Sequence, residues 1–96
     1  MDVQKAIRMV VESGKVDFGV RTGRMHALRG DAKMILVASN CPKATRDEVV
    51  QAAQKSNVNV KVVEFTSLEL GSVCGKPYPV STLSVLDAGN SEILSL

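Results

Sequence analysis

Apolar residues along this chain follow two periods, and segments with the two periods alternate from one end to the other. Apolar side chains three or four positions apart predict amphipathic helices, whereas short apolar runs and strict alternation predict strands. The expected helices follow Asp2, Thr22, Thr45 and Thr66, and the expected strands cover residues 16–20, 34–39, 58–65 and 80–86. This alternation predicts an α/β fold, a three-layer α/β/α sandwich with a four-stranded mixed sheet.

The expected helix ends carry recognisable signals. Thr45 and Thr66 are each followed three residues later by a glutamate, which is the spacing of a capping box. Each threonine is therefore expected to begin a helix. Thr22 is expected to cap the short helix that ends at Gly30.

Some apolar side chains are expected to pack against the sheet. Met25 and Leu28 are expected to turn inward from the helix after Thr22. The tail, residues 91–96, is expected to add one helical turn that places Ile93 and Leu94 against the sheet.

Length and composition indicate one domain covering residues 1–96. Hydrophobic residues make up 45% of the chain but aromatic residues only 3%, so we expect an aliphatic core, in which Tyr78 has no obvious place. The net charge of +2 is mildly basic. No apolar run approaches the roughly 20 residues that span a bilayer, and the N-terminal residues do not resemble a signal peptide. We therefore expect a cytoplasmic protein without a membrane partner.

Cysteine and histidine usage indicates neither a metal site nor an enzyme. Cys41 and Cys74 are far apart in sequence, and the single histidine, His26, does not complete a zinc site with them at any recognised spacing. We expect two reduced thiols, with Cys74 in the core and Cys41 partly exposed. His26 has no obvious acidic neighbour, so we expect no catalytic residues and no cofactor.

One loop places an amide beside a cation. Residues 39–43 connect an expected strand to an expected helix, so Asn40 lies at the C-terminal end of a strand, where ligands bind in open α/β sheets. The amide offers one acceptor and two donors, enough to read a base edge. A turn residue with a local hydrogen bond explains Asn40 too, and on this loop alone it is the simpler interpretation.

Two further loops combine residues suited to nucleic acid. Residues 19–23 place two glycines and Arg21 at a helix start, which suits one phosphate or simply shapes a tight turn, and they lack the signatures of nucleotide-binding loops. Tyr78 lies between two prolines, where it offers a flat surface to an unstacked base or serves a structural loop. Basic residues flank these loops, and they either form one patch or are ordinary solvated side chains: Arg21, Arg24, Lys43, Arg46 and Lys76.

Motifs spread over the whole chain carry a family resemblance. They are Gly19 with Arg21, residues 36–42, residues 69–71 followed by 75–76, and residues 85–94. In this combination the chain resembles the kink-turn RNA-binding family, and within it the ribosomal branch of archaea and eukaryotes.

The resemblance implies a non-enzymatic structural component of the large ribosomal subunit, which acts in translation in the cytoplasm. It also implies binding to a sharply bent internal loop of ribosomal RNA that contains tandem sheared G·A pairs. Other expected partners are neighbouring ribosomal proteins, and the free protein is expected to be a monomer.

The resemblance further implies a set of RNA-binding residues. Gly19, Arg21 and Thr22 would contact the RNA backbone and the sheared pairs. Asn40 would hydrogen-bond a guanine edge, with support from Lys43 through a phosphate. The loop before the last strand completes the set with Lys76, Tyr78, Pro79 and Val80, of which the last three would pack against a flipped nucleotide.

Two departures from the family pattern refine this expectation. Relatives in box C/D and box H/ACA particles carry Gly-Thr-Asn-Glu where this chain has residues 19–22, which favours the ribosomal branch. Related ribosomal proteins can carry a basic residue at the position of Pro79, so Pro79 is expected to contribute only apolar packing. The short termini favour an archaeal source.

Two other functions stay open from the sequence. One is a kink-turn RNA-binding protein that acts as a regulator or in another ribonucleoprotein particle. The other, of a different class, is a small nucleotide-binding α/β protein that uses the turn at residues 19–23.

Overall fold

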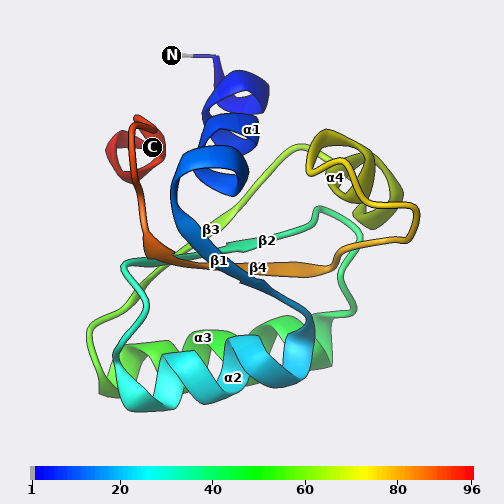
Figure 1. Cartoon of the computed structure of the whole chain (residues 1–96). Coiled ribbons are helices and arrows are strands. Elements are labelled where there is room, and N and C mark those ends of the chain that lie inside the picture. Colours follow the sequence, from blue (N-terminus) through cyan, green and yellow to red (C-terminus); the bar gives the residue numbers. More distant parts are fainter. Residues whose placement is uncertain (1) are drawn as a thin grey trace.

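A computed structural model describes residues 2–96, which form three layers (Figure 1). The elements are α1 (Val3–Ser13), β1 (Lys15–Phe18), α2 (Val20–Arg29), β2 (Met34–Val37), α3 (Lys43–Lys55), β3 (Asn59–Val62), α4 (Ser67–Val73), β4 (Thr82–Asp87) and the 3-10 turn η1 (Ile93–Ser95). Helices α1 and α4 and turn η1 cover one face of the sheet, and α2 and α3 cover the other. The expected α/β/α sandwich is confirmed.

The sheet has the strand order β1-β4-β2-β3. Strand β4 is antiparallel to both β1 and β2, whereas β2 and β3 are parallel, so the sheet is mixed as expected. Because β4 runs against its two neighbours, its first residues lie beside their last ones: Leu83 pairs with Phe18, and Thr82 pairs with Val37. The end of β1, the end of β2 and the start of β4 therefore share one edge of the sheet.

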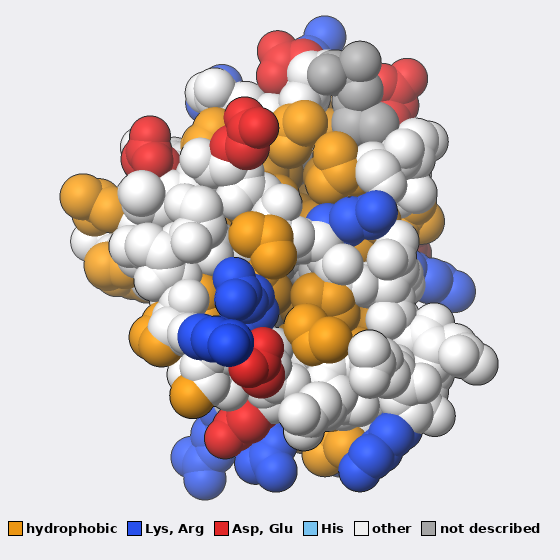
Figure 2. Space-filling view, turned by 180° about the vertical axis from the view of Figure 1, so that it is seen from behind, with side chains coloured by type: hydrophobic (Ala, Val, Ile, Leu, Met, Phe, Trp, Pro, Cys, Tyr) orange, Lys and Arg blue, Asp and Glu red, His pale blue; other side chains and the backbone are white. Residues whose placement is uncertain are grey.

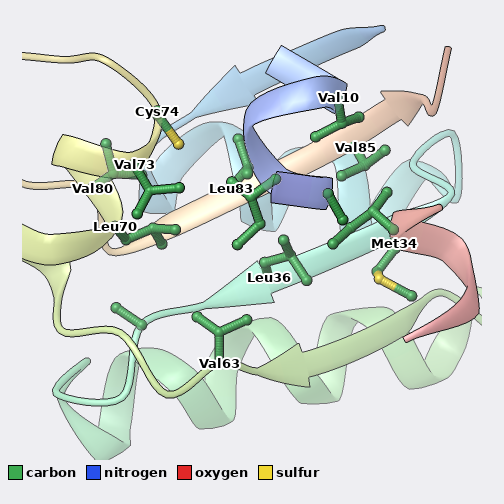
Figure 3. Close-up of a cluster of buried hydrophobic side chains, with 14 residues drawn as sticks. Val10, Met34, Leu36, Val63, Leu70, Val73, Cys74, Val80, Leu83 and Val85 are labelled. Atoms are coloured by element: carbon green, nitrogen blue, oxygen red, sulfur yellow. The ribbon is translucent and has the colours of Figure 1, made fainter. Parts of the chain in front are cut away.

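The core is aliphatic and lies on both faces of the sheet. All four residues of β2 are buried, and they alternate between two clusters. Met34 and Leu36 pack on the side of α1 and α4 (Figure 3), while Ile35 and Val37 pack on the side of α2 and α3. A strand that is apolar at every position is what a central, doubly covered strand requires.

Strand β3 forms an outer side of the sheet and leaves apolar surface exposed. Figure 2 looks onto this side and shows hydrophobic side chains in the middle of the face. Val62 is 51% exposed, and it lines a hollow of about 610 Å³ together with Val3, Phe65 and Leu96. Residues from the first and last segments of the chain thus line this hollow together with residues of β3.

One of the two expected capping boxes forms. The Thr66 hydroxyl accepts a hydrogen bond from the Glu69 amide (3.3 Å), and the Glu69 carboxylate accepts one from the Thr66 amide (3.0 Å). These hydrogen bonds to Thr66 also hold the pKa of Glu69 below its usual range.

The other two helix starts were predicted too late in the chain. Helix α3 begins at Lys43 rather than after Thr45, because the carbonyl of Pro42 already accepts the amide of Arg46 (2.9 Å). Helix α2 begins at Val20, directly after Gly19, and ends at Arg29 with the expected Gly30 as its C-cap.

Three side-chain placements differ from expectation. Met25, Leu28 and Leu94 are 37%, 50% and 45% exposed. The buried positions of α2 are instead the small or polar residues that fit close to the sheet, and turn η1 buries only Ile93. Where the helix lies very near the sheet, a large apolar side chain does not fit beneath it.

Both cysteines are free and buried. Burial raises the pKa of the Cys74 thiol to about 11, although Lys76 acts in the opposite direction. Cys41 was expected to be partly exposed, but it is 7% exposed because it packs in the cluster beneath α3. Among residues 2–96, no helix has the length and hydropathy needed to cross a membrane.

Candidate nucleic-acid interface

Backbone hydrogen bonds hold three loops together where β1 and β2 end and β4 begins. The N–H of Gly19 donates to the carbonyl of Thr82 (2.9 Å), and the N–H of Ala38 donates to the carbonyl of Ser81 (2.9 Å). The loop before β4 therefore lies between the other two, as β4 lies between β1 and β2. The structure thus brings the three loops singled out in the sequence to one edge.

The first loop is a tight turn from β1 into α2. Gly19 has a φ of +112°, which residues with a side chain rarely adopt. The Thr22 hydroxyl donates to the carbonyls of Phe18 (3.0 Å) and Gly19 (3.3 Å), so it tightens the turn instead of capping the helix. Within residues 2–96 no side chain forms a cap hydrogen bond at the start of α2, and Arg21 is exposed in its first turn. Helix N-terminal amides and a nearby guanidinium together favour an anion.

The second loop holds Asn40 in a fixed orientation. Asn40 is exposed, and its Oδ1 accepts a hydrogen bond from the backbone N–H of Ser67, the first residue of α4 (2.8 Å). A backbone N–H can only donate, so the oxygen of the amide faces α4 and the NH₂ group is left to donate elsewhere. The interpretation of Asn40 as a residue with a merely local turn bond is therefore wrong, because its partner is 27 positions away.

The third loop, before β4, lies against both α4 and the end of β1. The Lys76 ammonium is 4.9 Å from the centre of the Phe18 ring, a cation–π contact. At Gly71 of α4, an added Cβ would stand 2.1 Å from the carbonyl oxygen of Tyr78. Tyr78 is 47% exposed, and Pro79 is also exposed. This loop therefore presents an aromatic ring and a proline at the surface.

Val80 does not lie on that surface. Its side chain is 2% exposed and packs in the core (Figure 3), and its N–H donates to the carbonyl of Ser67 (2.9 Å). The expectation that Val80 offers an apolar contact surface is therefore wrong, because the side chain anchors its loop from below. Tyr78 and Pro79 carry the exposed apolar surface.

The expected basic residues lie on elements that meet at this edge. Arg21, Arg24 and Lys43 are exposed, and Arg46 and Lys76 are partly buried. Lys43 is the first residue of α3, whose start has no side-chain cap. With a net charge of only +2, electrostatic attraction for a polyanion depends on where these charges are placed.

Sequence reasoning missed the partners of His26. The side chain is buried, and its two ring nitrogens contact Asp17 of β1 and Asp31 of the loop after α2. Asp17 lies nine positions before His26, on the strand against which α2 packs, and Asp31 lies five positions after it, in the loop that follows α2. Among residues 2–96, no group of three or more His, Cys, Asp or Glu side chains is arranged to hold a metal ion.

Residues 1–95 match the family described as the ribosomal protein L7Ae/L30e/S12e/Gadd45 family. The chain belongs to this family. Among its relatives is a protein of Methanocaldococcus jannaschii named large ribosomal subunit protein eL30, which is 46% identical over 96 residues, 100% of this chain and 87% of the relative. A protein of the same name from Methanococcus maripaludis strain S2 is 41% identical, over 100% of this chain and 96% of the relative. The resemblance to the archaeal ribosomal branch is confirmed.

The family fold also appears in a more distant solved structure. A Bacillus halodurans protein described as having unknown function matches with a TM-score of 0.84 at 19% identity, over 98% of this chain and 93% of the other. At this identity the likeness shows the fold alone.

Proposed function

We propose that this protein is a structural, non-enzymatic component of the large ribosomal subunit, and that it binds a kink-turn internal loop of ribosomal RNA. Its family and the names of its archaeal relatives support the ribosomal assignment. That role places the protein in the cytoplasm, on the ribosome, beside other ribosomal proteins, with the free protein monomeric.

The orientation of the Asn40 amide carries the RNA-binding half of the proposal. Its oxygen accepts the Ser67 N–H, so the NH₂ group is left to donate to a ligand bound where the three loops meet. The major-groove edge of guanine offers only acceptors, N7 and O6, which match a donor. In a sharply bent RNA loop these edges are open to a side chain, unlike those in the deep groove of a regular RNA helix.

The two flanking loops supply the remaining contacts. Gly19, Arg21 and Thr22 lie at the start of α2, where backbone amides and a guanidinium attract phosphate. Tyr78 and Pro79 offer an apolar surface on which an unstacked nucleotide can pack. Lys43 and Lys76 add positive charge that attracts the phosphates of the RNA backbone. Val80 packs in the core and supports the third loop.

The proposal predicts recognition of shape together with a few base contacts. We would titrate a kink-turn RNA and a matched duplex in which Watson–Crick pairs replace the sheared G·A pairs, and measure binding by gel shift at about 0.1 M salt. The kink-turn RNA is expected to bind more tightly by about tenfold or more. Equal affinity for the two RNAs would overturn the proposal.

A second experiment tests the ribosomal role separately. The protein is expected to remain with large subunits when ribosomes are washed in high salt and sedimented. If the protein is released from the subunits but binds the isolated kink-turn RNA tightly, the alternative function as a regulatory kink-turn RNA-binding protein would be favoured.

A further inference from the structure

The buried face of α2 offers little apolar surface to the sheet. Its buried residues are Gly23, His26 and Ala27. An added Cβ at Gly23 would stand 2.6 Å from a methyl group of Thr82, so the helix lies very close to β4. The hydroxyls of Thr82 and Ser84 are buried and have no hydrogen-bond partner among residues 2–96. Burial of apolar area therefore contributes little to holding α2 in place.

His26 supplies the specific attachment. Its Nε2 lies 2.6 Å from Oδ2 of Asp17, and its Nδ1 lies 2.8 Å from Oδ1 of Asp31. Ionised carboxylates only accept hydrogen bonds, so both contacts are satisfied only when both ring nitrogens carry a proton. A neutral ring leaves one nitrogen lone pair facing a carboxylate. The arrangement therefore fits a buried imidazolium that joins α2 to β1 and to the loop before β2.

The charges around His26 favour this protonated state. Burial of the ring lowers its pKa, but the hydrogen bonds and negative charges of Asp17 and Asp31 outweigh burial and raise the pKa above its ordinary value of 6.5. The elements that pack against α2 turn uncharged residues inward: Thr82 and Ser84 of β4 lie beneath α2 at Gly23, and the buried residues of α3 are Val49, Ala52 and Ala53. The other charged residues of α2, Arg21, Arg24 and Arg29, line an outer hollow together with Glu48 of α3.

We propose that Asp17, His26 and Asp31 form a proton-dependent clamp that positions α2, so that RNA binding at the three-loop edge weakens when His26 loses its proton. This inference rests on the proposed function and adds regulation of the same site. His26 lies one helical turn after Thr22, and the start of α2, with Gly19 and Arg21, comes directly before Thr22. A shift of α2 on the sheet therefore moves the phosphate-binding turn. His26 is a positioning residue and does not itself contact RNA.

The clamp itself can be measured without RNA. The chain has one histidine, so its ring nitrogen NMR signals belong to His26 without ambiguity. Both nitrogens are expected to be protonated at about pH 6.5, with a titration midpoint above the ordinary histidine value. A ring with one unprotonated nitrogen at that pH, or a midpoint at or below the ordinary value, would overturn the clamp.

RNA binding is then compared between two variants with the same change in charge. Asp31→Asn removes one carboxylate of the clamp, and Glu12→Gln removes an exposed carboxylate on α1. If only net charge mattered, both variants would bind the kink-turn RNA as tightly as the wild type or more tightly. The clamp predicts instead that Asp31→Asn binds about fivefold more weakly than Glu12→Gln at about pH 8 and recovers at about pH 6. Asp17→Asn serves as the second variant if Asp31→Asn does not fold.

The outcomes separate this inference from the proposed function. Equal affinities of Asp31→Asn and Glu12→Gln at both pH values would overturn the regulation of RNA binding while leaving the proposed function intact. Absence of kink-turn binding by the wild type at any pH would overturn the proposed function together with this regulation. The NMR titration would still show in that case whether the clamp holds a proton.

Discussion

The amide of Asn40 can be separated into its two halves by substitution. Its oxygen accepts the Ser67 N–H at 2.8 Å, while its NH₂ group is proposed to donate to guanine. Asn40→Asp keeps an oxygen for the Ser67 N–H, removes the NH₂ donors and adds a negative charge at the start of α4. Asn40→Ala removes both halves.

The two halves contribute to different free energies. Loss of a base contact is expected to cost about 1–3 kcal/mol of binding, a weakening of roughly fivefold to 150-fold. The free energy of unfolding should change differently, because a carboxylate at a helix N-terminus stabilises by about 0.3–1 kcal/mol. Asn40→Asp is therefore expected to be at least as stable as the wild type and yet bind RNA at least about tenfold more weakly. Asn40→Ala should lose about 0.5–1.5 kcal/mol of stability as well as affinity.

Isothermal titration calorimetry with a kink-turn RNA measures the binding free energy, and urea unfolding measures the stability. Asn59→Asp is the matched control, since Asn59 is exposed at the start of β3 and pairs with Met34, at the opposite end of the sheet from the three loops. If Asn40→Asp bound RNA as well as Asn59→Asp did, the amide would have only a structural role and the reasoning would be refuted.

Three further predictions follow from single contacts. Lys43→Ala is expected to weaken RNA binding modestly and to lower the slope of log affinity against log salt by about one unit. The reason is that an exposed lysine contributes charge rather than base recognition. An unchanged slope would contradict this prediction. Gly71→Ala is expected to lower the free energy of unfolding in urea by about 1–3 kcal/mol, because its Cβ would meet the Tyr78 carbonyl oxygen, and a loss well below this range would show that the loop moves away freely. Cys74, with a pKa of about 11, is expected to react with a thiol reagent at about pH 8 far more slowly than an unfolded cysteine does, and rapid modification of the native protein would contradict its burial.

Stability against pH gives a fifth prediction, from the raised pKa of His26. The unfolded chain binds this proton less tightly than the folded chain does. The contribution of the clamp to stability is therefore complete below the ordinary pKa of 6.5, and it is lost as the pH rises through the folded-state pKa. Urea unfolding of the wild type and Asp31→Asn across this range should show a smaller loss in the variant, and parallel profiles would contradict the prediction.

The sequence predicted which elements exist more reliably than where they begin. The capping box of Thr66 formed because Glu69 and Thr66 are close in the chain and interact within one turn. The same pattern at Thr45 did not form a cap, because Pro42 started the helix earlier. A capping-box pattern predicts the first residue of a helix only where the helix does not already begin at an earlier residue.

The candidate site was predicted by residue type but not by geometry. Asn40 was identified from its place after a strand, yet its partner Ser67 lies on a helix far along the chain. Val80 was expected at the surface with Tyr78, and packing against the core buried it. His26 was expected to lack acidic partners, but Asp17 contacts it from the neighbouring strand β1 and Asp31 contacts it from the loop that follows α2.

The sequence alone determined the alternation of helices and strands, the aliphatic core and the residue types in the three loops, because periodicity records which side of each segment avoids water. The tertiary structure decided that those loops meet at one edge, since this depends on β4 inserting between β1 and β2 in antiparallel pairings. It also decided which way the Asn40 amide points and how His26 is surrounded. The Asn40 amide is oriented by a hydrogen bond between residues 27 positions apart, and His26 contacts Asp17 only because α2 packs on β1; a hydrophobic pattern encodes neither contact.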